Sequence, residues 1–196
     1  MSTTTTITVL VGIFLALAGY LATYVSNRLL AQRQARLERI NSQLNSLYGP
    51  LLADQALSKA AWKAYEEMTE GKWWDEGRPP DDEQSAQWQA LMTKVFQPAN
   101  RRMVECVKAN AALLLEDHMP PCLIQLAAHS AAYDILTVRW ARPQFVATRR
   151  EDLVARRKFP GDELEQYVRA SFAELKKDQL ELLGKLRRSA SRLLLR

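Results

Sequence analysis

The chain has 196 residues and a net charge of +5, with 47% hydrophobic and 25% charged side chains. This length and balance are typical of an ordinary globular domain, and they exclude a disordered chain and a multi-span membrane protein. Two cysteines exclude a disulfide-rich scaffold and a four-cysteine zinc module, and two histidines leave little for a histidine-based metal site. Composition alone therefore indicates no specific activity.

The first predicted element is a membrane span. Residues 7–25 read ITVLVGIFLALAGYLATYV, which is 19 residues without a charge, and a helix needs about 20 apolar residues to cross the hydrocarbon core. A cleaved signal peptide is the alternative interpretation, but residues 1–6 lack the basic side chains that a signal peptide carries. We therefore predict a retained, single-pass anchor over residues 1–27.

The residues that follow the span are basic and predict its orientation. No lysine or arginine precedes the span, whereas four arginines follow it closely: Arg28, Arg33, Arg36 and Arg39. The positive-inside rule then places the N-terminus outside and the rest of the chain in the cytoplasm, at the inner membrane. These four arginines are candidate contacts to the membrane surface.

A helical stalk is predicted over residues 28–50. Its apolar side chains recur at heptad spacing, with one arginine as a misfit: Leu30, Arg33, Leu37, Ile40, Leu44, Leu47 and Leu51. Such a seam either forms a coiled coil with a second copy or packs against helices of its own chain. We expect Gly49-Pro50 to interrupt the helix.

The remaining residues, 51–196, predict a helical bundle. Apolar stripes at helical spacing indicate five further helices, over residues 51–68, 83–96, 101–115, 121–138 and 163–188. We expect Asp81 or Asp82 to cap the second of these helices and Asp162 to cap the last. No strand pattern is present in the sequence. The predicted fold class is therefore all-α, with an N-terminal transmembrane helix that continues into a helical stalk and an antiparallel helical bundle.

Two of these helices and one loop carry specific expectations. In helix 51–68 the apolar stripe that should face the core is Leu57, Ala61, Ala64 and Met68. Helix 121–138 is apolar on two faces, which predicts a place at the centre of the bundle. One face includes Leu126, His129 and Tyr133, and the other includes Ile124, Ala127, Ala131, Ile135 and Val138. The loop over residues 70–82 contains Trp73-Trp74, which we expect to plug a bundle end rather than to hold a ligand.

Four stretches are similar to a known family. They are RLERINSQLNSLYGPLLA (36–53), NRRM (100–103), MPPCLIQLAAH (119–129) and FPGDELEQYVRASFAELK (159–176). These strings resemble a family of uncharacterised bacterial single-pass membrane proteins with an N-terminal transmembrane helix and a cytoplasmic helical domain. The resemblance implies a membrane-anchored helical protein, and it adds no information about activity, cofactor or catalytic residues.

The candidate polar site centres on Asp134, the one charged residue between residues 121 and 138. A buried carboxylate needs a partner, because an unpaired one costs several kcal/mol (about 3–5) or takes up a proton. A hairpin between residues 116 and 121 should bring Arg101 and Arg102 alongside, with His129 or Glu105 completing the cluster. We expect Asp134 to be at least partly buried and to form a structural ion pair with Arg101 or Arg102, with a ligand-binding role as the alternative.

No sequence motif indicates catalysis. A phosphate-binding loop, HExxH and GxSxG are all missing from the sequence, and Cys122 and His129 are about 10 Å apart along a helix. We therefore predict no enzyme activity, no cofactor and no metal. The predicted function is a membrane-anchored interaction or scaffold protein that binds membrane lipid and either a protein partner or a second copy. The alternative is a module that binds anionic lipid or another polyanion through residues 139–196, whose net charge is +7; nucleic acid is disfavoured.

Overall fold

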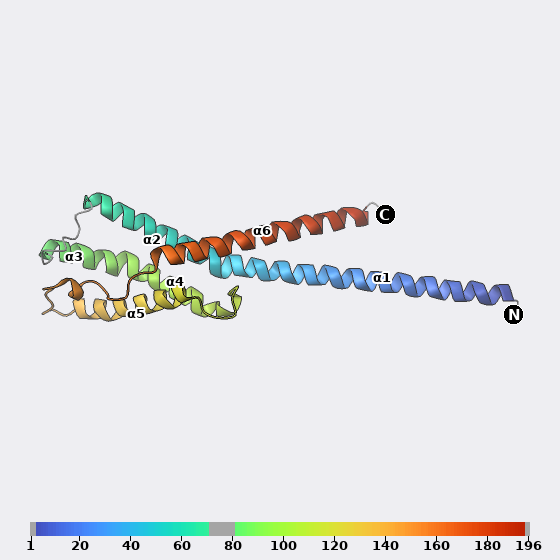
Figure 1. The fold of residues 1–196 in the computed structure, drawn as a ribbon, viewed down its shortest axis with the longest axis horizontal. Helices are drawn as coiled ribbons and strands as arrows, with labels where there is room; N and C mark the ends of the chain where they lie inside the picture. Colours follow the sequence, from blue (N-terminus) through green and yellow to red (C-terminus); the bar gives the residue numbers. More distant parts are fainter. Residues whose placement is uncertain (1–2, 71–80, 195–196) are drawn as a thin grey trace. The chain divides into compact units, whose positions relative to one another are not determined.

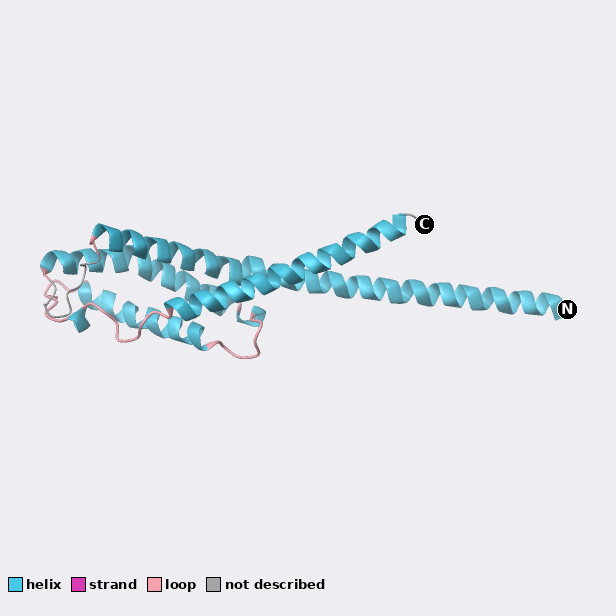
Figure 2. Cartoon of the chain, turned by 45° about the horizontal axis from the view of Figure 1, so that its top comes forward, coloured by secondary structure: helices cyan, strands magenta, loops and turns pink. Residues whose placement is uncertain are grey.

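The structure, a computed structural model, describes the backbone of residues 3–70 and 81–194 and the side chains of residues 7, 10–70 and 81–186. Every regular element in these ranges is a helix, which confirms the all-α fold class (Figure 2). The longer helices are α1 (Thr3–Ser42), α2 (Gly49–Met68), α3 (Asp82–Leu91), α4 (Gln97–Ala109), α5 (Pro121–Trp140) and α6 (Gly161–Leu194). Trp73 and Trp74 lie outside the described residues.

Two compact units divide the chain, one comprising residues 1–41 and 177–196 and the other residues 42–176. The boundary at residue 41 falls inside the predicted stalk. In the first unit, an ion pair of 2.8 Å joins Arg36 to Asp178, and the Gln179 side-chain amide donates to Asn41 Oδ1 at 2.6 Å. The stalk therefore contacts α6 of its own chain in this unit, whereas a coiled coil with a second copy stays a prediction.

The first unit also contains the predicted span. Among the described residues, one helix is long and apolar enough to cross a membrane, with a mean hydropathy of 1.5 over its most apolar 18 residues. None of that window is buried. Phe14, Leu15 and Tyr20 are among its most exposed side chains. The length and composition of this helix fit a membrane span.

The second unit is the helical bundle. Within it α4 packs against both α2 and α5 (Figure 1). The first part of α6 contacts α2 through the Lys59–Glu165 ion pair. The N-terminus of α3 is closed as predicted, because the Asp81 carboxylate accepts from the Gln84 backbone N–H at 2.7 Å in a capping box. The fully buried side chains of this unit come from several elements and form its core: Leu47, Tyr48, Leu51, Met103, Leu126, Leu153, Leu164 and Val168.

The predicted interruption at Gly49-Pro50 is wrong. The helix passes through it by way of a π-helical segment, Gln43–Tyr48, in which the Gly49 N–H donates to the carbonyl of Leu44, five residues back. Pro50 has no N–H for the carbonyl of Ser46, and the thiol of Cys106 donates to that oxygen at 3.3 Å instead. A neighbouring helix thus supplies the hydrogen bond that the proline removes.

A second π-helical segment, Met92–Phe96, precedes Pro98 in the same way. There the Gln97 N–H donates to the carbonyl of Met92, again five residues back. A proline normally ends or kinks a helix, but here α3 continues through this segment into α4, so the predicted gap between helices 83–96 and 101–115 is absent. In both places a π-helical turn accommodates a proline within a continuous helix.

The buried faces of α2 and α5 differ from the prediction. The stripe that contains Leu57 and Met68 is exposed, and α2 buries Leu51, Gln55, Ser58 and Tyr65 instead. On α5 the face with Leu126, His129 and Tyr133 is buried, whereas Ile124, Ile135 and Val138 are exposed. Helix α5 therefore lies at the edge of the bundle and not at its centre, because only one of its two apolar faces meets other helices.

The connector between α5 and α6 is part of the core. Asp152 and Leu153 are buried in it, next to a short 3₁₀ turn, Arg150–Asp152. The indole N–H of Trp140 donates to the carbonyl of Asp152 at 2.8 Å, and that of Trp88 donates to the carbonyl of Leu153 at 2.9 Å. Two tryptophans from different helices thus fix one segment of the connector. Helix α6 then starts at Gly161, one residue before the predicted cap Asp162, and the Leu164 N–H donates to the carbonyl of Pro160.

Candidate functional site

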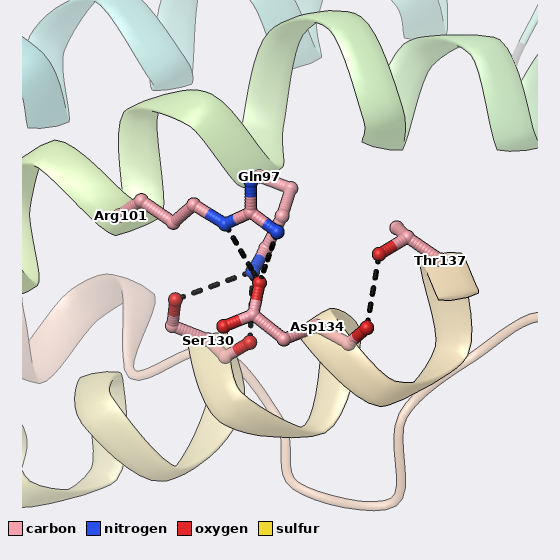
Figure 3. Close-up of polar contacts among 5 residues, drawn as sticks. All are labelled: Gln97, Arg101, Ser130, Asp134 and Thr137. Carbon is pink, nitrogen blue, oxygen red and sulfur yellow. Dashed lines mark hydrogen bonds and ion pairs between the residues drawn. The ribbon is translucent and has the colours of Figure 1, made fainter.

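The predicted polar cluster is divided in the structure. Arg101 on α4 reaches Asp134 on α5, with its Nε donating to Oδ1 at 2.7 Å (Figure 3). The Gln97 side-chain amide lies between the helices and donates both to Asp134 Oδ1 and to the carbonyl of Ser130, each at 2.8 Å. Asp134 therefore accepts hydrogen bonds from two residues of α4.

The predicted ion pair between Arg101 and Asp134 is confirmed, and Asp134 is partly buried rather than fully buried. The side chains of Arg101 and Asp134 are 57% and 44% exposed, because the pair lies where α4 and α5 meet solvent rather than between two apolar faces. An ion pair in this setting contributes little to stability, since water screens it and competes for its hydrogen bonds.

Replacing Asp134 by alanine should accordingly lower the free energy of unfolding by under about 1 kcal/mol. Gln97 keeps its bond to the Ser130 carbonyl in the variant, so no buried donor is left without an acceptor. Denaturant unfolding of the full-length chain measures this difference. A loss of about 3–5 kcal/mol would instead identify a buried pair.

The other two members of the predicted cluster lie elsewhere. Arg102 bonds to Asp54 on α2 through its Nε at 3.1 Å and its Nη2 at 2.7 Å, and these bonds raise the pKa of the Arg102 guanidinium. His129 is buried, and its Nδ1 lies 2.6 Å from the carbonyl of Arg157. Because that carbonyl only accepts, Nδ1 carries the proton. Burial lowers the pKa of His129, and the hydrogen bond to Arg157 opposes this change.

The predicted membrane-surface arginines lie on one helix. Arg28, Arg36 and Arg39 are exposed, and Arg33 is half-buried. Of these four arginines, Arg36 forms an ion pair with Asp178. Lipid contact through these residues stays a prediction, as does polyanion binding through residues 139–196.

Sequence reasoning missed a cavity of about 410 Å³ inside the bundle. Helix α2 contributes Gln55, Ser58, Lys59 and Trp62, which recur at positions i, i+3, i+4 and i+7 on one helix face. The remaining walls come from α3 to α6: Trp88, Met92, Phe96, Asn100, His129, Tyr133, Phe159, Gly161, Asp162 and Glu165. The sequence does contain this helix face, from Gln55 to Trp62, but the apolar stripe through Leu57 favoured a different face of α2 as the buried one.

An ion pair closes one side of the cavity. Lys59 Nζ lies 2.6 Å from Glu165 Oε2, and Arg169 Nε lies 2.9 Å from Glu165 Oε1. The hydrogen bond from Lys59 is the largest cause that lowers the pKa of Glu165, so this carboxyl is ionised at neutral pH. Both cations thus pair with the same carboxylate.

Metal binding has no support in the described residues. Across residues 3–70 and 81–194, no group of three or more His, Cys, Asp or Glu side chains is arranged to hold a metal ion. Cys106 and Cys122 are both free, and burial raises the pKa of each thiol. The polar features of the bundle are therefore hydrogen bonds, ion pairs and the cavity.

Comparison with known proteins gives no further guide to the site. No protein-family model, no curated protein and no solved structure matches this chain. The function must therefore be argued from the geometry of the helices, the exposed surfaces and the cavity.

Proposed function

We propose that this protein is a single-pass membrane protein whose helical bundle acts as an interaction domain on the cytoplasmic side. The apolar, exposed segment of α1 supports membrane attachment, and the arginines that follow it support the orientation. The observation that carries the interaction role is the α5 face, defined by its exposed apolar side chains: Ile124, Ala127, Ala131, Ile135 and Val138.

The α5 face is apolar along several turns of the helix. Ile124, Ile135 and Val138 are 57%, 73% and 66% exposed, and these side chains follow one another at helical spacing. Single exposed apolar residues are common on protein surfaces, whereas an aligned row of them is typical of a binding surface. The α5 face therefore provides a surface on which another helix gains apolar burial.

A second copy of the chain is the occupant that the pattern of this face favours. Ile124 and Val138 each lie seven residues from Ala131, and Ala127 and Ile135 each lie four residues from it. A two-fold axis through Ala131 would therefore place Ile135 of one copy against the small Ala127 of the other. The same axis would place Ala131 against its own copy at the centre and Ile124 against Val138 at each end, so that each contact occurs twice, as in an isologous interface.

Cysteine crosslinking in membranes tests the proposal. In a background with Cys106→Ser and Cys122→Ser, we expect Ala131→Cys to form a disulfide-linked dimer on oxidation. Ala127→Cys alone should form little dimer, but should crosslink to Ile135→Cys when the two variants are coexpressed. Ala64→Cys, on the exposed side of α2, is the matched control. A chain that stays monomeric with every cysteine on α5 would contradict the self-association.

The same variants test the membrane attachment and the orientation. The Ala64→Cys chain, whose thiol lies outside the proposed contact, should remain with membranes after an alkaline wash, and in intact cells a membrane-impermeant thiol reagent should leave it unlabelled. Labelling should appear once the inner membrane is opened. Release by the alkaline wash would contradict the anchor, and labelling from outside would contradict the orientation.

A further inference from the structure

The cavity in the bundle has a wall of aromatic rings. Trp62, Trp88 and Phe96 line it from α2, α3 and the segment that precedes α4, and Tyr133 and Phe159 line it from α5 and the connector before α6. Trp62 and Trp88 meet edge to face, with ring centroids 6.2 Å apart. Flat apolar walls of this kind accept a planar ring, because stacked and edge-to-face contacts both become available to it. The volume of about 410 Å³ is within the range of small-molecule sites.

Two residues that line the cavity each carry a buried oxygen that lacks a hydrogen bond within the described residues. They are Gln55 with Oε1 and Ser58 with Oγ, and the two residues are 3% and 9% exposed. The Gln55 side chain hydrogen-bonds to Glu165, and because the ionised carboxylate only accepts, the amide N–H donates and Oε1 takes no part in that bond. A buried polar atom without a partner destabilises a fold. A hydrogen-bond donor brought by a ligand would remove that cost.

The charged side chains at the cavity are either paired with one another or exposed to solvent. Lys59 and Arg169 both pair with Glu165, and His129 is a neutral imidazole whose Nδ1 proton is held by the Arg157 carbonyl. The remaining charged side chain on the wall, Asp162, is exposed to solvent in the first turn of α6. A charged ligand would therefore lose its hydration without gaining a buried counter-ion.

We propose that this cavity binds a small, neutral, planar aromatic molecule that carries an N–H or O–H donor, with the rings between the aromatic walls and the donor directed at Gln55 and Ser58. This site is independent of the α5 face, since none of the residues of that face lines the cavity. Failure of the self-association proposed above would leave it unaffected.

Indole and indene test the proposal as a pair. They have nearly the same shape, but only indole carries an N–H donor. The full-length chain in lipid nanodiscs is titrated with each probe by calorimetry, with empty nanodiscs as the blank. We expect saturable binding of both probes, with indole tighter by about three- to tenfold, which is the usual contribution of one hydrogen bond. Absence of saturable binding, or equal affinities for the two probes, would overturn the proposal.

Substitutions of Gln55 and Ser58 test whether their oxygens cause the preference for indole over indene. Gln55→Leu and Ser58→Ala should each reduce the preference for indole, and the double variant should bring the indole and indene affinities to within about twofold. Gln125→Leu, at an exposed glutamine of α5 that does not line the cavity, is the matched control and should keep the preference. An unchanged preference in the double variant would contradict the assignment.

A thermal melt without ligand distinguishes loss of binding from loss of folding. Ser58→Ala removes only a hydroxyl group that has no partner in the described residues, so we expect its midpoint to equal or exceed that of the unmodified chain, whereas Gln55→Leu also removes the amide N–H that donates to Glu165. Ser58→Ala therefore keeps the test decisive if Gln55→Leu folds poorly. The proposal would be overturned if the Ser58→Ala chain melts like the unmodified protein and both single variants, Ser58→Ala and Gln55→Leu, keep the full preference for indole over indene.

Discussion

Replacing Asp152 by alanine should lower the free energy of unfolding by about 3 kcal/mol. The carboxylate is 4% exposed. Its Oδ2 accepts from the backbone N–H groups of Thr148 and Arg149 and from the Thr148 hydroxyl at 3.1–3.2 Å, and its Oδ1 accepts from Arg139 at 2.8 Å. Truncation leaves these donors unsatisfied and frees the segment whose carbonyls hold Trp140 and Trp88. Denaturant unfolding measures the loss.

The same carboxylate predicts how stability depends on pH. Burial raises the pKa of Asp152, but the hydrogen bonds from Thr148 and Arg149 and the charge of Arg139 outweigh it and lower the pKa overall. A lowered pKa in the folded state means that the stabilisation is complete above the unfolded value of about 3.9 and is lost as the pH falls through the folded value. The unmodified chain should therefore lose more stability than Asp152→Ala in this acid range.

Asp117→Ala provides the control. That carboxylate is fully exposed beside His118, and its removal should change the free energy of unfolding by under about 0.5 kcal/mol. An Asp152→Ala chain as stable as Asp117→Ala would show that the connector between α5 and α6 is held by its apolar contacts alone.

Replacing Gly49 by alanine should destabilise the bundle by about 1–3 kcal/mol, the usual cost of forcing extra atoms into a packed site. A Cβ atom at this position would collide with the carbonyl oxygen of Leu44. That oxygen is the one to which the Gly49 N–H donates across the π-helical turn. It belongs to the backbone, so it moves only if the turn itself changes, and the turn carries the buried Leu47 and Tyr48.

Gly184→Ala is the matched control for this substitution. Gly184 lies in the interior of α6, and no atom lies within 4 Å of a Cβ built on it. Alanine has the higher helix propensity, so this variant should be as stable as the unmodified chain or more stable, by up to about 1 kcal/mol. Equal melting of Gly49→Ala and Gly184→Ala would contradict the close contact at the π-helical turn.

The sequence by itself determined the helical class and much of the element order. Apolar residues at helical spacing predicted the helices, because each must bury one stripe. Pro121 marks the start of α5, since the first turn of a helix needs no donor there, and Asp81 caps α3 because its carboxylate reaches the free N–H of Gln84. The uncharged run over residues 7–25 identified the apolar part of α1. These are local effects, and neighbouring residues are enough to decide them.

Contacts between distant residues decided the rest. Pro50 alone predicts a break, but the thiol of Cys106, 56 positions further along the chain, supplies the missing donor. The uncharged run around Asp134 predicts a partly buried ion pair, but only the packing of α4 against α5 selects Arg101 as the partner and leaves the carboxylate 44% exposed. Periodicity shows that α2 and α5 each have more than one face that could be buried in the core. Only the positions of the other helices determine which of these faces is buried. The cavity follows from that choice, because burial of the face with Gln55 and Ser58 joins polar atoms to aromatic rings from four other segments of the chain.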